Sequence, residues 1–151
     1  MSKKNIVMRL FAALSSVIIM VTLSACSSDN KTAEYNDGTY TGRSSDFEED
    51  ESGNGAGYGE VTIKIESNKI TDCTFKMYEL DGTLKDENYG SGLSRENRLK
   101  AQKAVQSADK YSSAIVGKSS ADEVDAISGA TISCNEFKEA VNNALKKAEK
   151  S

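Results

Sequence analysis

The sequence predicts an α+β domain in which two helices pack on a small, mostly antiparallel sheet, preceded by a signal peptide and a flexible tether. Apolar residues alternate in two stretches between residues 58 and 79, a pattern typical of half-buried strands. After residue 94 they recur every three or four positions in two runs, as in amphipathic helices. Strands followed by helices, in 151 residues without an internal repeat, favour one α+β domain.

The first 25 residues are expected to be a lipoprotein signal peptide. Three cations, Lys3, Lys4 and Arg9, precede the 14-residue apolar run Leu10–Leu23. About 20 residues are needed to span a bilayer, so this run fits the apolar part of a signal peptide. It ends in LSAC, which resembles a bacterial lipobox whose cysteine, Cys26, is lipidated and begins the mature protein. An ordinary signal peptide with an incidental cysteine is the alternative.

Lipidation would place the domain at the cell membrane, on its extracytoplasmic face. Two acyl chains on Cys26 anchor a protein stably. Residues 26–36 are then the lipidated cysteine and a polar, flexible tether, and residues 37–151 are the domain. The pair Asp37-Gly38 marks a turn before a first strand in the sequence TYTGRSS, in which Tyr40 is the expected buried residue.

Charge and missing residue types exclude several functions. Without the three cations ahead of Cys26, the 19 basic residues fall to 16 against 23 acidic ones, and the net charge of −7 argues against nucleic acid as a partner. The absence of histidine excludes a His-dependent triad, a His metal site and haem attachment. Cys73 and Cys134 are too few for an iron–sulfur cluster, so redox chemistry would need an organic cofactor. These two cysteines could pair, but we expect both to pack as free thiols.

The stretch Asp46–Gly57 allows two interpretations. It is acidic and then glycine-rich, which is typical of a solvated surface loop. Alternatively, Gly53, Gly55, Gly57 and Gly59 let the backbone approach a ligand. It is not a Walker or Rossmann loop, because the Lys-Ser/Thr ending and the strand–glycine–helix order are missing.

A β-hairpin is predicted next. In residues 58–67, Val61, Ile63 and Ile65 face one side of a strand. Residues 67–69 form a turn in which Asn68 can adopt a positive φ, and residues 70–79 form a second strand with a less regular pattern. A further turn is expected at Asp81-Gly82.

The two helices are predicted from caps and periodicity. Ser94 is the expected N-cap of the first, and Gly117 its expected stop. The sequence VDAI, at residues 124–127, is expected to be a short edge strand. Ser133 and Glu136 fit a capping box, so the last helix is expected to begin near Ser133. The apolar faces of the two helices are Ala101, Ala104, Val105, Ala108, Tyr111 and Ile115, and Phe137, Ala140, Val141, Ala144, Leu145 and Ala148.

A motif of small residues precedes the last helix. Ser128, Gly129, Ala130 and Thr131 lead into the expected cap at Ser133, which would leave Thr131 in an open turn. The start of a helix offers free N–H groups and the positive end of the helix dipole, which suit a phosphate. A hydroxyl held there is well placed to carry a phosphate ester.

Three segments together resemble the FMN-binding domain family: DGTYTG, GYGEVTIKIESNKITDCTF and VDAISGATISCNEFKEAVNNAL. That domain occurs in the periplasm-facing subunits of sodium-translocating NADH:quinone reductase and of Rnf complexes, and in many bacterial lipoproteins. The resemblance extends from about Asp37 to Leu145. Its most specific piece is Asp-x-x-Ser-Gly-Ala-Thr, at residues 125–131.

The resemblance implies that FMN is joined to Thr131 by a phosphodiester, and that a flavin transferase makes this bond with FAD as donor and AMP as product. Gly129 and Ala130 add little bulk beside the acceptor. Ser128 would bind the phosphate or only satisfy the turn. Asp125 would position a metal or polarise the acceptor hydroxyl during transfer, or only stabilise the turn. Candidates for stacking on the flavin ring are Tyr58 first, and then Tyr40, Tyr78, Tyr89 and Phe75.

The predicted function is that of a membrane-anchored extracytoplasmic flavoprotein, an electron-transfer shuttle or redox module. Its expected partners are the transferase, a membrane electron donor and an extracellular acceptor. No side chain resembles a catalytic acid, base or nucleophile, so an electron carrier is favoured over an enzyme with its own substrate, and no metal site is expected. The alternative is a non-redox lipoprotein that binds a solute or a partner.

Overall fold

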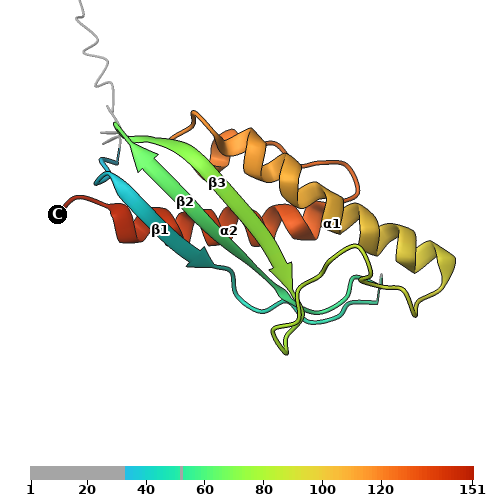
Figure 1. The fold of residues 1–151 in the computed structure, drawn as a ribbon. Coiled ribbons are helices and arrows are strands. Elements are labelled where there is room, and N and C mark those ends of the chain that lie inside the picture. Colours follow the sequence, from blue (N-terminus) through green and yellow to red (C-terminus); the bar gives the residue numbers. More distant parts are fainter. Residues whose placement is uncertain (1–32, 52) are drawn as a thin grey trace, which may run out of the picture. The chain divides into compact units, whose positions relative to one another are not determined.

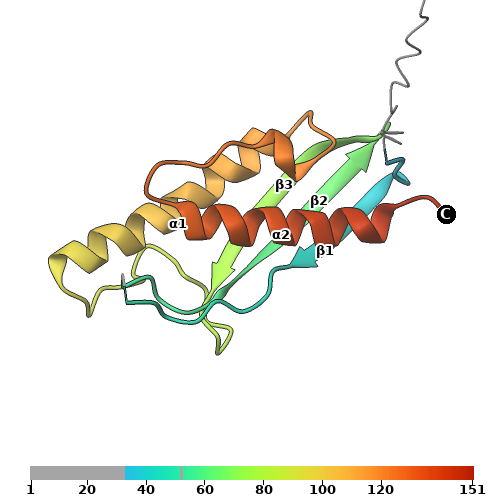
Figure 2. The same ribbon diagram turned by 180° about the vertical axis from the view of Figure 1, so that it is seen from behind.

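A three-stranded antiparallel sheet carries two long helices on one face (Figures 1 and 2). The computed structural model describes residues 33–51 and 53–151. The elements are β1 (Gly38–Arg43), β2 (Tyr58–Glu66), β3 (Lys69–Tyr78), α1 (Arg95–Ile115), the 3₁₀ turn η1 (Ala121–Glu123) and α2 (Thr131–Ala148). The strands are arranged in the order β1-β2-β3, with α2 packed on β1 and β2 and α1 on β3. The predicted α+β class with two packed helices is confirmed.

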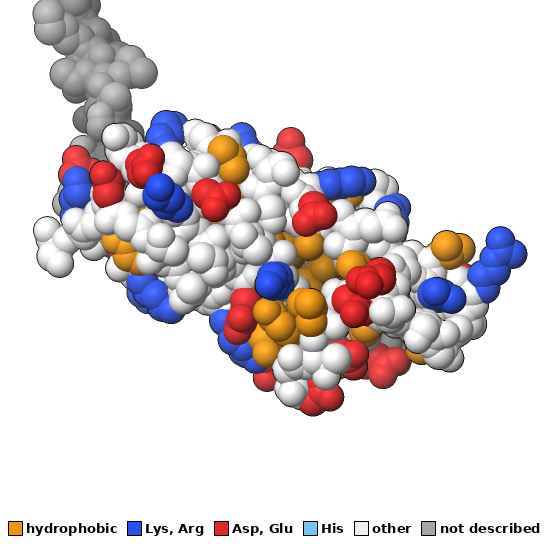
Figure 3. Space-filling view, in the orientation of Figure 1, with side chains coloured by type: hydrophobic (Ala, Val, Ile, Leu, Met, Phe, Trp, Pro, Cys, Tyr) orange, Lys and Arg blue, Asp and Glu red, His pale blue; other side chains and the backbone are white. Residues whose placement is uncertain are grey.

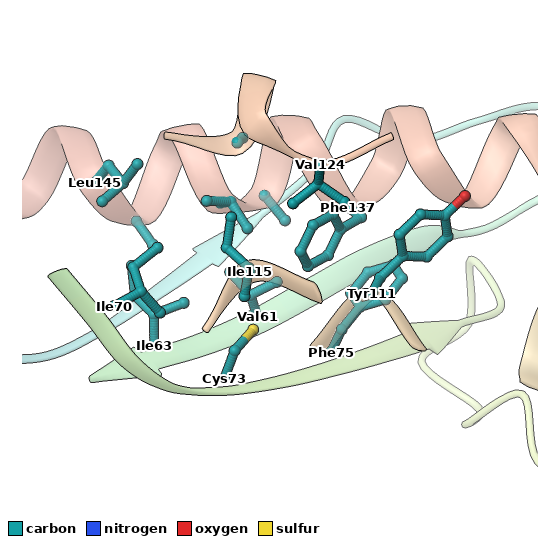
Figure 4. Packing of buried hydrophobic residues seen from close by; sticks show 14 of the residues in the cluster. Val61, Ile63, Ile70, Cys73, Phe75, Tyr111, Ile115, Val124, Phe137 and Leu145 are labelled. Atoms are coloured by element: carbon teal, nitrogen blue, oxygen red, sulfur yellow. The ribbon is translucent and has the colours of Figure 1, made fainter. Parts of the chain in front are cut away.

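The core lies between the helices and one face of the sheet (Figure 4). Val61, Ile63 and Ile65 alternate along β2 as predicted, and each is at most 1% exposed. Phe137 from α2 packs against Phe75 from β3 with ring centroids 5.1 Å apart. In the described part of the chain, no helix combines the length and the hydropathy needed to cross a bilayer.

The β2–β3 hairpin has the predicted turn. Ser67 and Asn68 both have positive φ, 51° and 64°, as the two central residues of a type I′ turn require. The irregular pattern of the second strand has a physical cause. Lys64 pairs with Asp72 but Ile65 pairs with Ile70, so one extra residue of β3 is accommodated as a bulge. The bulge lets Ile70 and Cys73 both face the core although they are three residues apart.

The ends of α1 are those predicted from local signals. The Ser94 hydroxyl accepts a hydrogen bond from the Asn97 N–H at 3.3 Å, and Gly117 follows the helix with φ of 84°. The predicted apolar face divides into two parts, however. Tyr111 and Ile115 are fully buried, whereas the first part of that face, residues 101–105, is only partly buried. That part of the helix lines a cleft that opens beside the start of α2.

The predicted edge strand at residues 124–127 is wrong. The chain forms η1 just before it and then runs without regular structure to α2. A local capping box explains the difference. The Ser120 hydroxyl accepts from the Asp122 N–H at 3.2 Å, and the Glu123 carboxylate accepts from the Ser120 N–H at 3.1 Å. Glu123 therefore belongs to a helical turn, and the residues after it do not join the sheet.

The folded domain begins before the predicted boundary at Asp37. Tyr35 is buried, its N–H donates to the Asn68 side chain at 2.7 Å, and the Asn36 N–H donates to the Ala148 carbonyl at 2.8 Å. The end of the predicted tether is thus paired with the end of α2. Tyr40, expected to be buried, is only half-buried. The predicted signal peptide, Cys26 and the rest of the tether lie outside the described residues.

Both cysteines of the domain are free and buried, as expected for packing thiols. Burial, with a smaller contribution from the charge of Asp72, raises the pKa of Cys73 to about 12. This thiol therefore stays protonated at neutral pH and behaves as an apolar group.

Candidate functional site

The small-residue motif forms a tight turn that leads directly into α2. The Ala130 N–H donates to the Ile127 carbonyl at 2.9 Å, which closes a β-turn with Ser128 and Gly129 at its centre. Gly129 has φ of 75°, a conformation that side chains with a Cβ rarely adopt. Ser128, Gly129 and Thr131 are exposed, and Ala130 is buried. The turn therefore fixes the backbone and leaves the Thr131 side chain open to solvent.

The predicted start of the last helix is wrong by two residues. α2 begins at Thr131, and its N-cap is Ala130, whose carbonyl accepts the first helical hydrogen bond from the Cys134 N–H at 3.0 Å. Ser133 and Glu136, expected as a capping box, are buried within the helix. An alanine N-cap has no side-chain acceptor, so no side chain of the cap binds the N–H groups of the first turn. Thr131 thus lies at an uncapped helix start and not in an open turn.

Asp125 is exposed in the segment between η1 and α2. Within the described residues, none of the hydrogen bonds or ion pairs uses its carboxylate. The proposed turn-stabilising role therefore has no contact to support it here, and a role in the transfer reaction remains a prediction.

A cleft of about 790 Å³ opens beside the start of α2. Its walls are the glycine-rich loop, the irregular segment after β3, the N-terminal half of α1 and the first two turns of α2. Ile132 and Ser133, which follow Thr131 in the helix, are among the lining residues. Leu80 and Leu84 line it as well and are each more than 40% exposed, and Figure 3 shows hydrophobic side chains gathered at the surface near the end of β3.

The glycine-rich loop is one wall of this cleft. The Phe47 N–H donates to the Gly57 carbonyl at 2.7 Å, which closes the base of the loop. A Cβ at Gly55 would collide with the Tyr89 hydroxyl, and the Gly55 carbonyl accepts from the Lys85 ammonium at 3.3 Å. Within the described residues, the groups that come close to the backbone of this loop are therefore other parts of the cleft, Tyr89 and Lys85. The acidic half of the stretch is mostly exposed, as in a solvated surface loop, whereas the glycine half packs against Tyr89 and Lys85.

Two oppositely charged side chains are buried in the cleft, Lys85 from the segment after β3 and Glu136 from α2. Burial lowers the pKa of Lys85 and raises the pKa of Glu136, and the opposite charge of each partly offsets the effect of burial on the other. Neither buried charge was predicted from the sequence, because Glu136 fits a helix cap and Lys85 lies in a segment without periodicity. Perturbed groups of this kind are often found at functional sites.

Glu136→Gln is expected to stabilise the folded protein near neutral pH. A carboxyl group whose pKa is raised by folding opposes folding in its charged form, so its contribution becomes more unfavourable as the pH rises from 4.5 through the folded pKa. The gain should be on the order of 1 kcal/mol, the usual size of a single-substitution effect. Urea denaturation measured from pH 4 to pH 8 should show the difference from wild type shrinking toward pH 4.

The matched control is Glu139→Gln, which changes the same charge at an exposed position of α2. It should show no gain comparable to that of Glu136→Gln. Equal stability of wild type and Glu136→Gln at every pH would contradict the assignment of Glu136 as a buried group that opposes folding when it is charged.

Tyr58, the first candidate for ring stacking, lies away from this cleft. It precedes Gly59 and Val61, which face the helices, so its own side chain projects from the opposite face of the sheet. There its ring stacks on Tyr78 with centroids 5.4 Å apart, and the Arg43 guanidinium lies 3.7 Å from its ring centroid. The structure therefore does not bring Tyr58 together with the motif. Among the other candidates, Tyr89 lines the cleft.

The chain matches the model of the family described as the FMN-binding domain over residues 54–146, which is more than half of its length. It is also similar to the crystal structure of the CPE2226 protein from Clostridium perfringens, with 25% sequence identity and a TM-score of 0.55. That alignment covers 76% of this chain and 88% of the other. No curated protein matches the chain. The family match includes the uncapped helix start, the motif from Asp125 to Thr131 and most of the cleft.

Proposed function

Because the chain belongs to the FMN-binding domain family, we propose that its flavin is FMN held covalently at Thr131, and that the protein carries electrons outside the cytoplasmic membrane. The observation that carries the proposal is the position of Thr131. Its side chain is exposed at the first residue of α2, beside uncapped N–H groups and next to a cleft. Phosphate oxygens are stabilised at such a helix start.

The residues around Thr131 fit a bound flavin nucleotide. A cleft of about 790 Å³ lies within the range of roughly 300–1,000 Å³ that is usual for small-molecule sites. Ala130 leaves the helix start without a side-chain cap, and Gly129 has no side chain between Ser128 and the acceptor residue. Ser128 is exposed in the same turn and can donate a hydrogen bond to a phosphate oxygen.

The attachment is a transfer reaction that a flavin transferase carries out with FAD. The Thr131 oxygen forms a bond to the phosphorus of the FMN half, the pyrophosphate bond breaks, AMP leaves, and the hydroxyl proton is lost. Asp125, exposed six residues before the acceptor, would assist by polarising the hydroxyl or by positioning a metal ion. Once attached, FMN supplies one- and two-electron chemistry at its ring.

A covalent link suits a protein outside the cell. A flavin that dissociates there is diluted away, whereas a tethered ring rebinds at a high effective concentration. Weak contacts in an open cleft are then sufficient. The partners of this carrier would be a membrane electron donor and an extracellular acceptor, and lipid at Cys26 would hold it at the membrane.

Intact-mass measurement after co-expression with a flavin transferase tests the proposal. The expected result is an added mass equal to FMN less one water, with yellow colour that survives denaturation and precipitation. A protein that stays colourless and gains no mass in a host with an active transferase would overturn covalent attachment. It would favour the alternative, a lipoprotein that binds a solute or a partner without redox chemistry.

Cys26→Ala is expected to abolish anchoring. The variant lacks the acceptor for the acyl chains, so it should be released from the membrane or remain unprocessed. Membrane fractionation, followed by mass analysis of the N-terminus, measures both outcomes. A fully processed Cys26→Ala protein that remains in the membrane fraction would show that the LSAC sequence is not a lipobox.

A further inference from the structure

We infer that Tyr111 is a positioning residue for the acceptor, because its hydroxyl holds both ends of the turn that presents Thr131. The Ile127 N–H donates to this hydroxyl at 2.9 Å, and the hydroxyl donates to the Ala130 carbonyl at 3.2 Å. Ile127 opens the turn, and Ala130 closes it one residue before Thr131. This inference rests on the proposed function of Thr131.

The two hydrogen bonds are compatible with one another. A phenol hydroxyl has one proton to donate and lone pairs that accept, so it can serve an N–H and a carbonyl at once. Burial raises the pKa of Tyr111, which keeps the phenol protonated and able to donate. The Ala130 carbonyl also accepts the first helical bond of α2 from the Cys134 N–H. The hydroxyl therefore joins the turn to the helix start.

The ring that carries this hydroxyl is fixed by packing. Tyr111 is fully buried and stacks on Phe137 of α2 with centroids 5.3 Å apart and planes 19° from parallel. Phe75 of β3 meets it edge-on at 6.5 Å. Figure 4 shows the Tyr111 ring beside Phe137. Because the ring contacts both α2 and the sheet, its hydroxyl has a defined position relative to the turn.

This arrangement matters for transfer because alignment of a reacting hydroxyl contributes to the rate. A misplacement of about 1 Å can slow a reaction by about a hundredfold. Without the phenol oxygen, the Ile127 N–H loses its partner and the turn is held by its own single hydrogen bond. Thr131 would then sample more positions. Docking of the transferase would change less, because the surface of the domain is the same.

The test compares Tyr111→Phe with Ile115→Val during FMN transfer to purified apoprotein by a flavin transferase with FAD. Tyr111→Phe removes one oxygen and keeps the ring. Ile115→Val removes a buried methyl one turn further along the same helix, leaves both hydrogen bonds of the Tyr111 hydroxyl in place, and controls for lost stability. We expect Tyr111→Phe to lower kcat for labelling about tenfold with little change in KM, and Ile115→Val to label at the wild-type rate. Wild-type kcat for Tyr111→Phe, or an equal loss in both variants, would overturn the inference.

A measurement on the unlabelled wild-type protein does not depend on any variant folding. The Ile127 amide should exchange with solvent slowly, at a rate close to that of core amides, because its acceptor is fully buried. In Tyr111→Phe the same amide should exchange at least tenfold faster. Fast exchange of the Ile127 amide in the folded wild type would also overturn the inference. Failure of wild type to label at all would instead contradict the proposed function, so the two failures are distinguishable.

Discussion

Thr131→Ala is expected to fold as wild type does and to carry no covalent flavin. The side chain is exposed at the first residue of α2, and the bond that starts the helix belongs to the Ala130 carbonyl. Losing a hydroxyl and a methyl at such a position should change stability by less than about 0.5 kcal/mol. Labelling should fall to background, because no other atom replaces the acceptor oxygen. In-gel flavin fluorescence after co-expression with the transferase measures the label, and circular dichroism checks the fold.

Two further variants make this test specific. Thr131→Ser keeps a hydroxyl at the helix start and should retain part of the label. Ser128→Ala should reduce labelling less than Thr131→Ala, since Ser128 is proposed only to assist. A folded Thr131→Ala protein that fluoresces like wild type would move the attachment site elsewhere. Ser128, which is exposed, would then be tested before Ser133, which is only 3% exposed.

The features that a few neighbouring residues determine could be predicted from the sequence. The hairpin at Ser67-Asn68 needs two residues that tolerate positive φ, and the ends of α1 need only a hydroxyl at Ser94 and a glycine after the last turn. These features were therefore predictable from the sequence. The bulge in β3 was visible as an irregular pattern, although the pattern alone did not identify its cause.

The start of α2 was not predictable in this way. Of the S-x-x-E patterns at Ser120–Glu123 and at Ser133–Glu136, only the first forms a capping box. The second pair is buried within α2. The turn before the helix is held by the Tyr111 hydroxyl, from a residue 16 to 19 positions earlier in the chain. A contact between residues so far apart in the chain cannot be detected in the sequence around the turn.

The cleft combines parts that are distant in the chain, so its charged residues could not be assigned from sequence. Lys85 and Glu136 line the same cleft only because the segment after β3 and the first two turns of α2 both border it. The position of Tyr58, in contrast, could have been predicted from the sequence. Tyr58 shares the parity of Glu60 and Thr62, the exposed side of β2, and not that of the buried Val61. Strand parity could have placed it on the open face of the sheet.

Gly42→Ala is expected to destabilise the domain by about 3 kcal/mol or more, the upper part of the range for overpacked sites. A Cβ at Gly42 would lie 2.6 Å from the Ala144 nitrogen and would collide with the Ala140 carbonyl oxygen. Both are backbone atoms of α2, so no side-chain rotation can relieve the contact. Urea denaturation should show a large fall in the midpoint.

The helix cannot easily move away from β1 to make room. The Asn143 amide donates to the Arg43 carbonyl at 2.8 Å, and the Lys147 ammonium donates to the Thr41 carbonyl at 2.7 Å, so α2 is bonded to β1 on both sides of Gly42. Lifting α2 would also open a void beside the fully buried Val141. Gly92→Ala is the matched control, because nothing lies within 4 Å of a Cβ at that position, and it should be neutral within about 0.5 kcal/mol. If Gly42→Ala and Gly92→Ala unfold at the same urea concentration, α2 does not rest directly on β1. The helix that carries Thr131 would then have to be held in place by other parts of the core.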